Sequence, residues 1–248
     1  MAMSERVSEF NTVKFLPVGD CALLVEFGRK VDSRINARVR ALSDAVLAAD
    51  FFWLKDIVPA FASLLVCFDR EAAAPAEVLR EMRRLVEELP LAAGGEKRVW
   101  RIPVCYEGEF APDMADMERL TGLPAAEIIR LHSGRDYLIY MLGFLPGFPY
   151  LGGLDERIHA ARLDSPRVRI EAGSVGIGGA QTGVYPVESP GGWRLIGRTP
   201  LRLYAPNREQ PIVYQAGDYI RFLPIDSAEF VRLQELALPP EQILEVAE

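Results

Sequence analysis

The chain has 248 residues and half of them are hydrophobic, so it can form one large domain or two ordinary ones with a sizeable core. It carries 28 lysines and arginines against 35 aspartates and glutamates, and the formal net charge of -7 would repel a phosphate backbone. No apolar run approaches the roughly 18 residues of a membrane span, and MAMSERVSEF has no apolar signal core. We therefore expect a folded cytoplasmic protein that binds neither nucleic acid nor membrane.

Residues 13–106 alternate between strand-like and helix-like runs. Strands are expected at VKFLPV, CALLVEF, SLLVCF and RVWRIPV, and helices over 36–48 and 75–89. In the second helix, Val78, Met82, Leu85 and Leu89 recur at three- and four-residue spacing, which predicts one face packed on a sheet. This order is close to a split βαβ unit. We predict that residues 1–106 form an α+β, ferredoxin-like domain.

The remaining residues have a different pattern of helix and strand signals. Residues 112–134 predict two short helices separated at Gly122 and Pro124, and we assign 107–136 as a helical connector. From Tyr137 to RFLPI at 221–225, short apolar strands alternate with glycine and proline, as in a compact β-barrel. SAEFVRLQELAL then predicts a closing helix. We therefore expect residues 137–248 to form a β-barrel domain with a C-terminal helix.

The three cysteines are widely spaced and lie in apolar runs; they are Cys21, Cys67 and Cys105. This pattern predicts buried thiols that serve packing in a reducing compartment.

Most catalytic signatures are missing. All four lysines lie within the first 97 residues, so the glycine-rich half has no Walker loop or Schiff-base lysine. Ser174 lacks the G-x-S-x-G spacing of a hydrolase elbow, and no G-x-G-x-x-G opens a βαβ unit. The two histidines, His132 and His159, have no neighbouring ligand residues, so no metal site is expected.

The stretch from 173 to 199, GSVGIGGAQTGVYPVESPGGWRLIGRT, holds eight glycines. Glycines can bring backbone N–H groups close to a ligand, and arginines suit carboxylate or phosphate. Together they predict a site for a small anionic or amide substrate. The alternative is that the glycines only permit tight barrel turns and that the arginines are solvated. The arginines around this stretch are Arg167, Arg169, Arg194, Arg198 and Arg202.

The loop GFLPGFPYLGG places aromatic residues between glycines and prolines. Phe144, Phe148 and Tyr150 are thereby held on a stiff, extended segment. Together with Trp193 they are expected to form an apolar wall that meets a substrate or another protein. Plain core packing is the alternative.

Several long motifs occur in a fixed order. They are GDCALLVEFG at 19–28, LHSGRDYLIYMLGFLPGFPYLGGLD, SPR, AGSVGIGGAQTGVYP, ESPGGWRLIGRTP and AGDYIRFLPI. Over roughly residues 13 to 225 the chain resembles the KipI family, also called the 5-oxoprolinase B-subunit family and allophanate hydrolase subunit 1. The resemblance implies an N-terminal α/β domain and a C-terminal cyclophilin-like β-barrel.

The same resemblance implies a function. Family members act with an A-type protein and a KipA-like C-type protein in the ATP-dependent opening of 5-oxo-L-proline to L-glutamate. Two alternatives stay open: an inhibitor of a sensor histidine kinase, and a carboxyltransferase-like component of urea or allophanate metabolism. The chain has no recognisable P-loop. ATP is therefore expected as a cofactor of the complex, and the isolated chain is expected to be inactive.

The chain departs from the family pattern at two points. The family commonly reads PRR where this chain has Ala161, Arg162 and Leu163, and PAGS where it has Glu171 before AGS. A negative Glu171 beside an anion site weakens binding unless it points away or pairs with Arg167 or Arg169.

Site roles can be assigned on this basis as hypotheses. Arg167 and Arg198 are expected at the anionic groups, and Gln181 and Thr182 are expected to orient the amide. The alternatives are that Gln181 and Thr182 only hold a turn and that Arg198 only bridges strands.

Two further roles complete the expected site. The N–H groups of the segment containing Gly176, Gly178 and Gly179 are expected to stabilise the oxyanion. His132 is a candidate proton carrier because its ordinary pKa lies near working pH. It lies at the end of a helical run, however, and a C-terminal helix cap is the favoured alternative.

Overall fold

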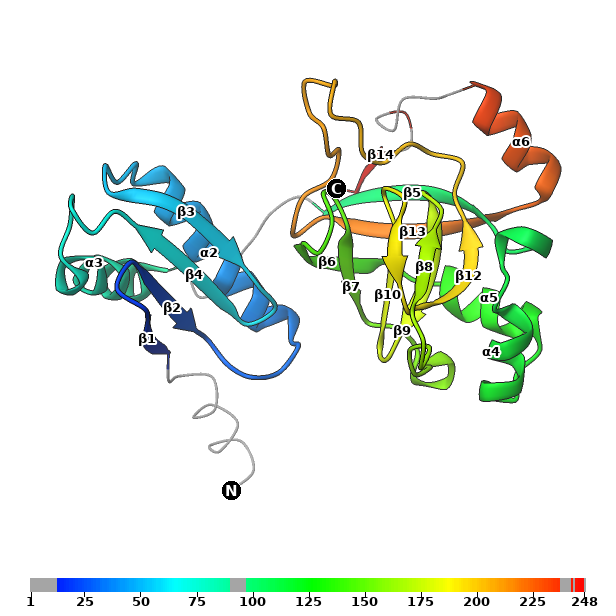
Figure 1. Cartoon of the computed structure of the whole chain (residues 1–248), viewed down its shortest axis with the longest axis horizontal. Helices are drawn as coiled ribbons and strands as arrows, with labels where there is room; N and C mark the ends of the chain where they lie inside the picture. Colours follow the sequence, from blue (N-terminus) through cyan, green and yellow to red (C-terminus); the bar gives the residue numbers. More distant parts are fainter. Residues whose placement is uncertain (1–12, 90–96, 237–241, 243, 248) are drawn as a thin grey trace. The chain divides into compact units, whose positions relative to one another are not determined.

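The computed structural model describes residues 13–89, 97–236, 242 and 244–247. The chain divides into two compact units, Met1–Gly95 and Glu96–Glu248 (Figure 1). None of the described helices is both long and apolar enough to cross a membrane.

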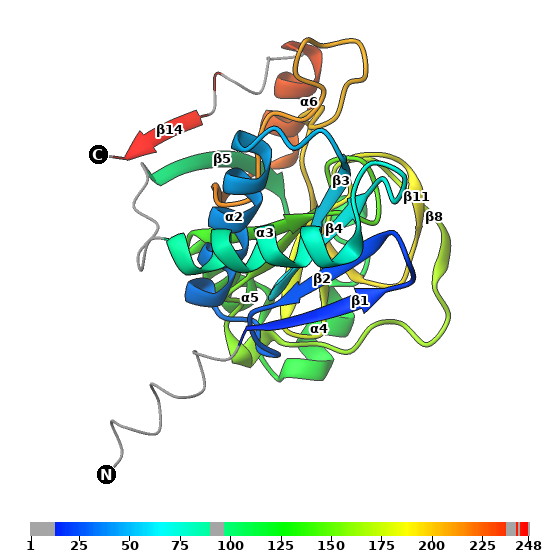
Figure 2. The same cartoon turned by 90° about the vertical axis from the view of Figure 1, so that its left-hand side faces the viewer.

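The first unit is a four-stranded antiparallel sheet with two helices. Its strands follow the order β1-β2-β4-β3. Helices α2 and α3 lie next to each other on one face of this sheet (Figure 2). The elements are β1 (Lys14–Val18), β2 (Ala22–Glu26), α2 (Ser33–Ala48), β3 (Leu54–Pro59), β4 (Ser63–Phe68) and α3 (Pro75–Glu88).

Local sequence explains both helices of this unit. The Asp32 side chain caps α2 by accepting from two backbone N–H groups, and Pro75 opens α3 where no N–H partner is needed. Val78, Met82 and Leu85 are buried on the sheet-facing side of α3. The amphipathic spacing predicted for this helix is therefore confirmed.

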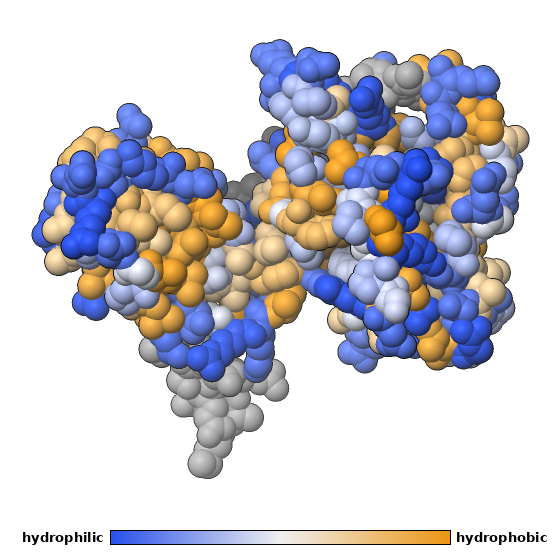
Figure 3. Space-filling view, in the orientation of Figure 1, coloured by the Kyte–Doolittle hydropathy of each residue, from blue (hydrophilic) through white to orange (hydrophobic). Residues whose placement is uncertain are grey.

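The other face of this sheet is partly apolar. Register places Leu16 beside Leu24, Leu24 beside Leu65, and Leu65 beside Val58, which makes one row across all four strands. Leu16 and Val58 at the ends of the row are exposed. Figure 3 shows hydrophobic residues gathered over this unit. No described helix of the first unit covers this row.

The predicted ferredoxin-like pattern is not confirmed. The sequence pattern gave no indication of strand β3, and the edge position beside β2 is taken by β1. Strand β5 (Lys97–Cys105), which was expected to complete the first domain, pairs instead within the second unit. The division of the chain consequently falls after Gly95, upstream of the expected boundary at Tyr106.

The second unit is built on a β-barrel. In the part of the chain that the structure describes, the order β12-β9-β10-β7-β6-β13-β5 returns to β12 through a β12–β5 pairing, which closes a ring of seven strands. The predicted barrel is therefore confirmed. The ring strands after β5 are β6 (Tyr137–Leu142), β7 (Pro149–Gly152), β9 (Ser174–Gly178), β10 (Gln181–Val184), β12 (Arg194–Arg198) and β13 (Tyr219–Ile225).

Strand β5 holds the barrel together. It pairs in parallel with β13 along seven residues, from Val99 opposite Tyr219 to Cys105 opposite Ile225. It also pairs with β14 (Leu244–Ala247). Its buried side chains Trp100, Ile102 and Val104 belong to the barrel core.

The expected connector helices are present as α4 (Met114–Thr121) and α5 (Ala125–Ser133). Gly122 ends α4 with φ of 69°, the left-handed conformation that glycine adopts at little cost. Met117, Ile128 and Leu131 are buried in the barrel core. The two helices are therefore part of the barrel unit.

Shorter elements complete the second unit. Strands β8 (Arg167–Ile170) and β11 (Ser189–Gly191) form a separate two-stranded sheet. Two short 3-10 helices lie at Gly108–Phe110 and Glu156–Ile158. The predicted closing helix is α6 (Ser227–Leu236); residues 237 and 238 of that prediction lie outside the described residues.

The cysteine prediction holds for one residue of three. Cys105 is buried, Cys67 is half-buried and Cys21 is exposed. Cys21 stands at the turn before β2, where the chain reverses at the surface, so its apolar neighbours do not bury it.

Candidate functional site

The predicted site residues fall into three places in the second unit. His132 and Thr182 are buried in the barrel interior, without exposed surface. The glycines and most of the aromatic residues meet on the outer side of β9 and β10. Arg198 lines a pocket beside α6, and Gln181 does not. The sequence motifs therefore do not form one cluster.

His132 is hydrogen-bonded through both ring nitrogens. Its Nε2 lies 2.8 Å from the hydroxyl of Thr182, which itself donates to the carbonyl of Gly176 at 3.0 Å. The hydroxyl has one proton, so Nε2 carries the ring proton and donates to Thr182. Nδ1 then accepts from the hydroxyl of Tyr106 at 2.8 Å.

This environment keeps the imidazole of His132 neutral. Burial lowers its pKa to about 3, and its ring stacks on Phe222 with centroids 4.6 Å apart. The ring caps no helix carbonyl, because both nitrogens bond to side chains across the interior. The geometry therefore fits neither the proton-carrier role nor the helix-cap role expected from the sequence. His132 fastens α5 to the barrel wall.

Three of the glycines make room for one tryptophan side chain. A Cβ atom on Gly178 would lie 2.5 Å from the ring of Trp193. Cβ atoms on Gly176 and Gly183 would lie 3.2 and 3.1 Å from other atoms of that side chain, and the one on Gly183 would also lie 2.9 Å from the carbonyl oxygen of Pro149. Much of the glycine content of β9 and β10 is therefore explained by the packing of Trp193.

The N–H groups of this segment are not directed at a ligand. Strand β9 has hydrogen-bonded neighbours on both edges, β10 and β12. The N–H of Gly179 donates to the carbonyl of Ala160 at 2.7 Å, and its φ of 67° turns the chain into β10. The oxyanion role expected for these N–H groups is therefore not supported, because they take part in the hydrogen bonding of the sheet and of its turn.

The aromatic loop is divided between packing and exposure. Phe148 packs edge-on against Trp193 with centroids 5.4 Å apart, and both rings are buried. Tyr150 contacts both rings. Phe144 instead is 62% exposed at φ of 66°, inside a tight turn closed by the N–H of Leu145 on the carbonyl of Gly143. Core packing accounts for Phe148 and Trp193, and Phe144 remains at the surface.

Arg167 is engaged by a buried carboxylate. Its Nη2 donates to Asp113 at 2.6 Å, and the other oxygen of Asp113 accepts from the N–H of Leu195 at 2.6 Å. Asp113 is 4% exposed, so it needs this cation as its partner. Asp113 thus connects the segment before α4 to β8 through Arg167 and to β12 through Leu195. The anion-binding role expected for Arg167 is therefore not supported.

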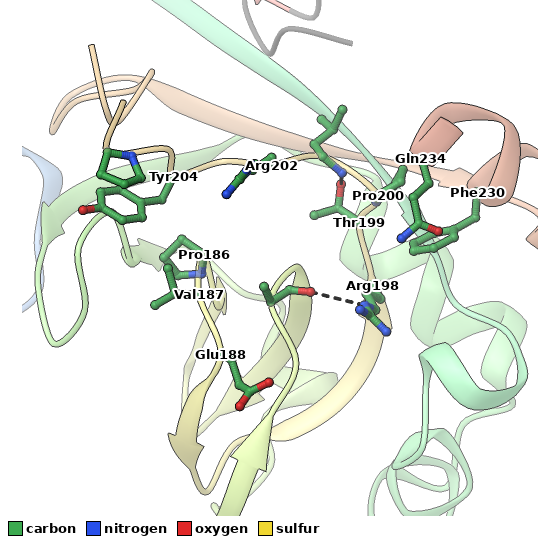
Figure 4. A pocket seen from close by; sticks show the side chains of 13 residues that line it. Pro186, Val187, Glu188, Arg198, Thr199, Pro200, Arg202, Tyr204, Phe230 and Gln234 are labelled. Atoms are coloured by element: carbon green, nitrogen blue, oxygen red, sulfur yellow. Dashed lines mark hydrogen bonds between the residues drawn. The ribbon is translucent and has the colours of Figure 1, made fainter. Parts of the chain in front are cut away.

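A pocket of about 430 Å³ opens where β12 ends (Figure 4). Its lining comes mainly from three segments: the chain around 186–188, the run from 198 to 206, and α6. Figure 4 shows Tyr204 and Pro186 at one end and Phe230 and Gln234 of α6 at the other. The lining residues are Ala172, Pro186, Val187, Glu188, Arg198, Thr199, Pro200, Leu201, Arg202, Tyr204, Pro206, Phe230 and Gln234.

The pocket joins two guanidinium groups to an apolar wall. Arg198 donates from Nε to the carbonyl of Ala172 at 3.2 Å. Arg202 has no ion-pair partner within the described ranges. The carboxylate in the lining, Glu188, pairs with Arg169 at 2.8 Å. Such a site suits a small anion with an apolar body.

Glu171 contacts Arg198, one of the two arginines that line the pocket. Its carboxylate forms an ion pair with Arg198, and not with Arg167 or Arg169 as the sequence suggested. A turn holds it there: the N–H of Ser174 donates to the carbonyl of Glu171 at 3.2 Å, and Gly173 has the φ of 85° that a type II turn requires. The glycine lies so close to Thr199 that a Cβ would be 2.4 Å from its carbonyl oxygen.

Sequence reasoning missed several pocket residues. Arg202 was named among the arginines around the glycine-rich stretch but was assigned no specific role, and Thr199, which also lines the pocket, was not singled out. Phe230 and Gln234 come from α6, which has the pattern of an ordinary amphipathic helix. Only the fold brings that helix beside β12.

Comparison with known proteins agrees with this architecture. The family described as carboxyltransferase domain, subdomain C and D, matches residues 13–214. The 5-oxoprolinase B subunit of Bacillus subtilis (strain 168) is 39% identical over 228 residues, which cover 88% of this chain and 95% of that protein. This chain belongs to the 5-oxoprolinase B-subunit family. A second family member, from Escherichia coli O157:H7, is 38% identical over 207 residues, 84% of this chain and 94% of that protein.

Solved structures extend the comparison beyond the 5-oxoprolinase B-subunit family. The crystal structure of TTHA0988 is similar with a TM-score of 0.74 and 34% identity, over 87% of this chain and 41% of that one. This chain thus corresponds to less than half of TTHA0988. Kluyveromyces lactis urea carboxylase shares the fold with a TM-score of 0.72 at 20% identity, over 95% of this chain and 24% of that one.

Proposed function

We propose that this chain is the B subunit of an ATP-dependent 5-oxoprolinase that opens 5-oxo-L-proline to L-glutamate together with the A-type and KipA-like C-type proteins. The observation that carries the proposal is the 39% identity along 95% of the Bacillus subtilis 5-oxoprolinase B subunit. The pocket beside α6 adds chemistry of the right kind. Its size suits a small molecule, and its charge suits a carboxylate.

The substrate is a five-membered lactam with one carboxylate. A site for it needs a cation for the carboxylate, an apolar wall for the ring and a polar group for the amide. In this proposal Arg202 binds the carboxylate because its charge is not already neutralised. Pro200 and Phe230 contact the ring, and the exposed Gln234 amide hydrogen-bonds to the lactam.

The role of this chain in catalysis is to bind and orient the lactam. An unstrained lactam is a poor electrophile, and ATP makes it reactive by phosphorylating the amide oxygen before water adds. The sequence has no P-loop, and no lysine follows Lys97, so it carries no signature of a nucleoside triphosphate site of that type. We therefore assign ATP binding to the other proteins of the complex.

The proposal is tested by reconstitution. The chain is purified with candidate A-type and C-type proteins, and glutamate formation from 5-oxo-L-proline is measured with and without ATP. We expect turnover only when all three proteins and ATP are present. Omitting each protein in turn serves as the control. Turnover by this chain alone, or an assembled complex that carboxylates urea and leaves 5-oxoproline intact, would contradict the proposal.

A further inference from the structure

Arg198 lines the pocket and already forms an ion pair with a carboxylate of the same chain, that of Glu171. We infer that Glu171 is an internal competitor at Arg198, and that it weakens the binding of dicarboxylates to this pocket more than the binding of monocarboxylates. The inference rests on the proposed function, which makes the pocket a carboxylate site. It adds a means of discriminating between substrate and product.

The exposure of the two side chains favours displacement. The side chain of Glu171 is 54% exposed, while that of Arg198 is 28% exposed. A carboxylate that already faces water is rehydrated easily when it leaves its cation. Surface ion pairs of this kind are weak, so the competitor lowers the affinity for an entering carboxylate by only roughly two- to fivefold.

The geometry keeps Arg198 oriented after Glu171 leaves. Arg198 Nε donates to the carbonyl of Ala172, which lies in the same turn as Glu171. This hydrogen bond does not involve the Glu171 carboxylate. The turn itself is anchored by the N–H of Thr199 on the carbonyl of Gly173 at 2.9 Å. Removing Glu171 from the guanidinium therefore frees its outer nitrogens without releasing the side chain.

The second arginine makes the effect selective. A ligand with one carboxylate can bind at Arg202, whose charge is not neutralised by any described residue, and can leave the Glu171–Arg198 pair intact. A ligand with two carboxylates gains Arg198 only by displacing Glu171. Opening a lactam monocarboxylate creates a second carboxylate. Glu171 therefore lowers affinity for the ring-opened product and favours its release.

The test measures affinities by isothermal titration calorimetry on the full chain. The probes are 5-oxo-L-proline as the monocarboxylate, with L-glutamate and glutarate as dicarboxylates. In Glu171→Gln we expect both dicarboxylates to bind about two- to fivefold more tightly, and 5-oxo-L-proline to change by less than about twofold. Glu188→Gln is the matched control, because it removes another exposed carboxylate from the same pocket but leaves Arg198 paired.

Three outcomes would overturn the inference. They are unchanged dicarboxylate affinity in Glu171→Gln, an equal gain for both classes of ligand, and the same gain in Glu188→Gln. Absence of binding by every probe to both the unaltered chain and Glu171→Gln would overturn it as well. Failure of the proposed function looks different: the reconstituted complex forms no glutamate, while Glu171→Gln still tightens glutarate binding.

Discussion

The indole ring of Trp193 lies directly on the backbone of Gly178, and a Cβ atom at that glycine would be 2.5 Å from the ring. The next residue, Gly179, has open space within 4 Å of its Cβ position but a φ of 67°. Two adjacent glycines are thus required for different reasons. One leaves room for a side chain, and the other permits a turn.

Alanine substitutions should separate these two requirements. Gly178→Ala forces the indole to move, so we expect the free energy of unfolding to fall by about 1–3 kcal/mol. Gly179→Ala places a side chain at positive φ, which costs about 1–2 kcal/mol without any contact to the ring. Urea unfolding of each variant gives both values.

A second substitution distinguishes the causes. In a Trp193→Phe background the ring is smaller, so the effect of Gly178→Ala should shrink, while that of Gly179→Ala should not change. Equal behaviour of the two alanine variants in both backgrounds would contradict the seating of Trp193 on Gly178.

Acid should weaken the fold through His132. Its pKa is about 3 in the folded chain against an ordinary value of 6.5, so the unfolded chain binds more protons between these pH values. The free energy of unfolding therefore falls as pH drops through that window, by up to ~1.4 kcal/mol per pH unit from this residue. Denaturant unfolding at several pH values should show a shallower slope for His132→Gln than for the unaltered chain. Identical slopes would mean that His132 is not buried in its neutral form.

Arg202 should govern substrate affinity in the assembled complex. Arg202→Gln removes the pocket cation that has no described ion-pair partner, and the loss of a charged hydrogen bond is expected to raise KM for 5-oxo-L-proline by about 10- to 100-fold. Arg119→Gln is the control, since it removes an exposed arginine that pairs with Asp116 outside the pocket. Steady-state kinetics of both variants decides the matter, and an unchanged KM in Arg202→Gln would place the carboxylate elsewhere.

Arg198→Lys tests the neighbouring cation. Lysine keeps the charge but loses the planar fork, so one terminal group cannot contact both the Ala172 carbonyl and an anion in the same way. We expect near-normal melting, normal assembly with the other proteins of the complex and an unchanged KM for 5-oxo-L-proline, but weaker binding of L-glutamate, because only a dicarboxylate reaches Arg198. A raised KM for 5-oxo-L-proline in this variant would place the substrate carboxylate at Arg198 instead of Arg202.

The boundary between the units predicts which fragment folds. A fragment of residues 96–248 retains β5 and should melt cooperatively, whereas 107–248 lacks the strand that pairs with β12 and β13 and should not. Circular dichroism of the two fragments makes the comparison. Cooperative melting of 107–248 would restore the boundary expected from the sequence.

Elements with local signals were predicted well. The face of α3 follows from the spacing of Val78, Met82 and Leu85, and the break between α4 and α5 follows from Gly122 and Pro124. Strand β5 was recognised as a strand but placed in the wrong unit. Its apolar pattern describes burial and contains no information about β13, a partner far along the chain.

The site was harder to predict for a similar reason. An arginine in sequence looks the same whether its partner is a buried Asp113, as for Arg167, or a solvent-facing Glu171, as for Arg198. A glycine beside a ligand likewise looks the same as a glycine beneath Trp193. These choices depend on residues brought together by the barrel, so composition left both alternatives open.

The closing of the barrel through β5 and β13 also sets an order of events during synthesis. Val99 emerges from the ribosome early, but its partner Tyr219 follows only after most of the second unit has been translated. The first unit, by contrast, has all its strand partners within residues 14–68 and can fold while translation continues. Until residues 219–225 arrive, β5 lacks the partner that pairs with it along seven residues, and an incompletely paired apolar strand is the kind of surface that chaperones bind and that promotes aggregation when translation stops early.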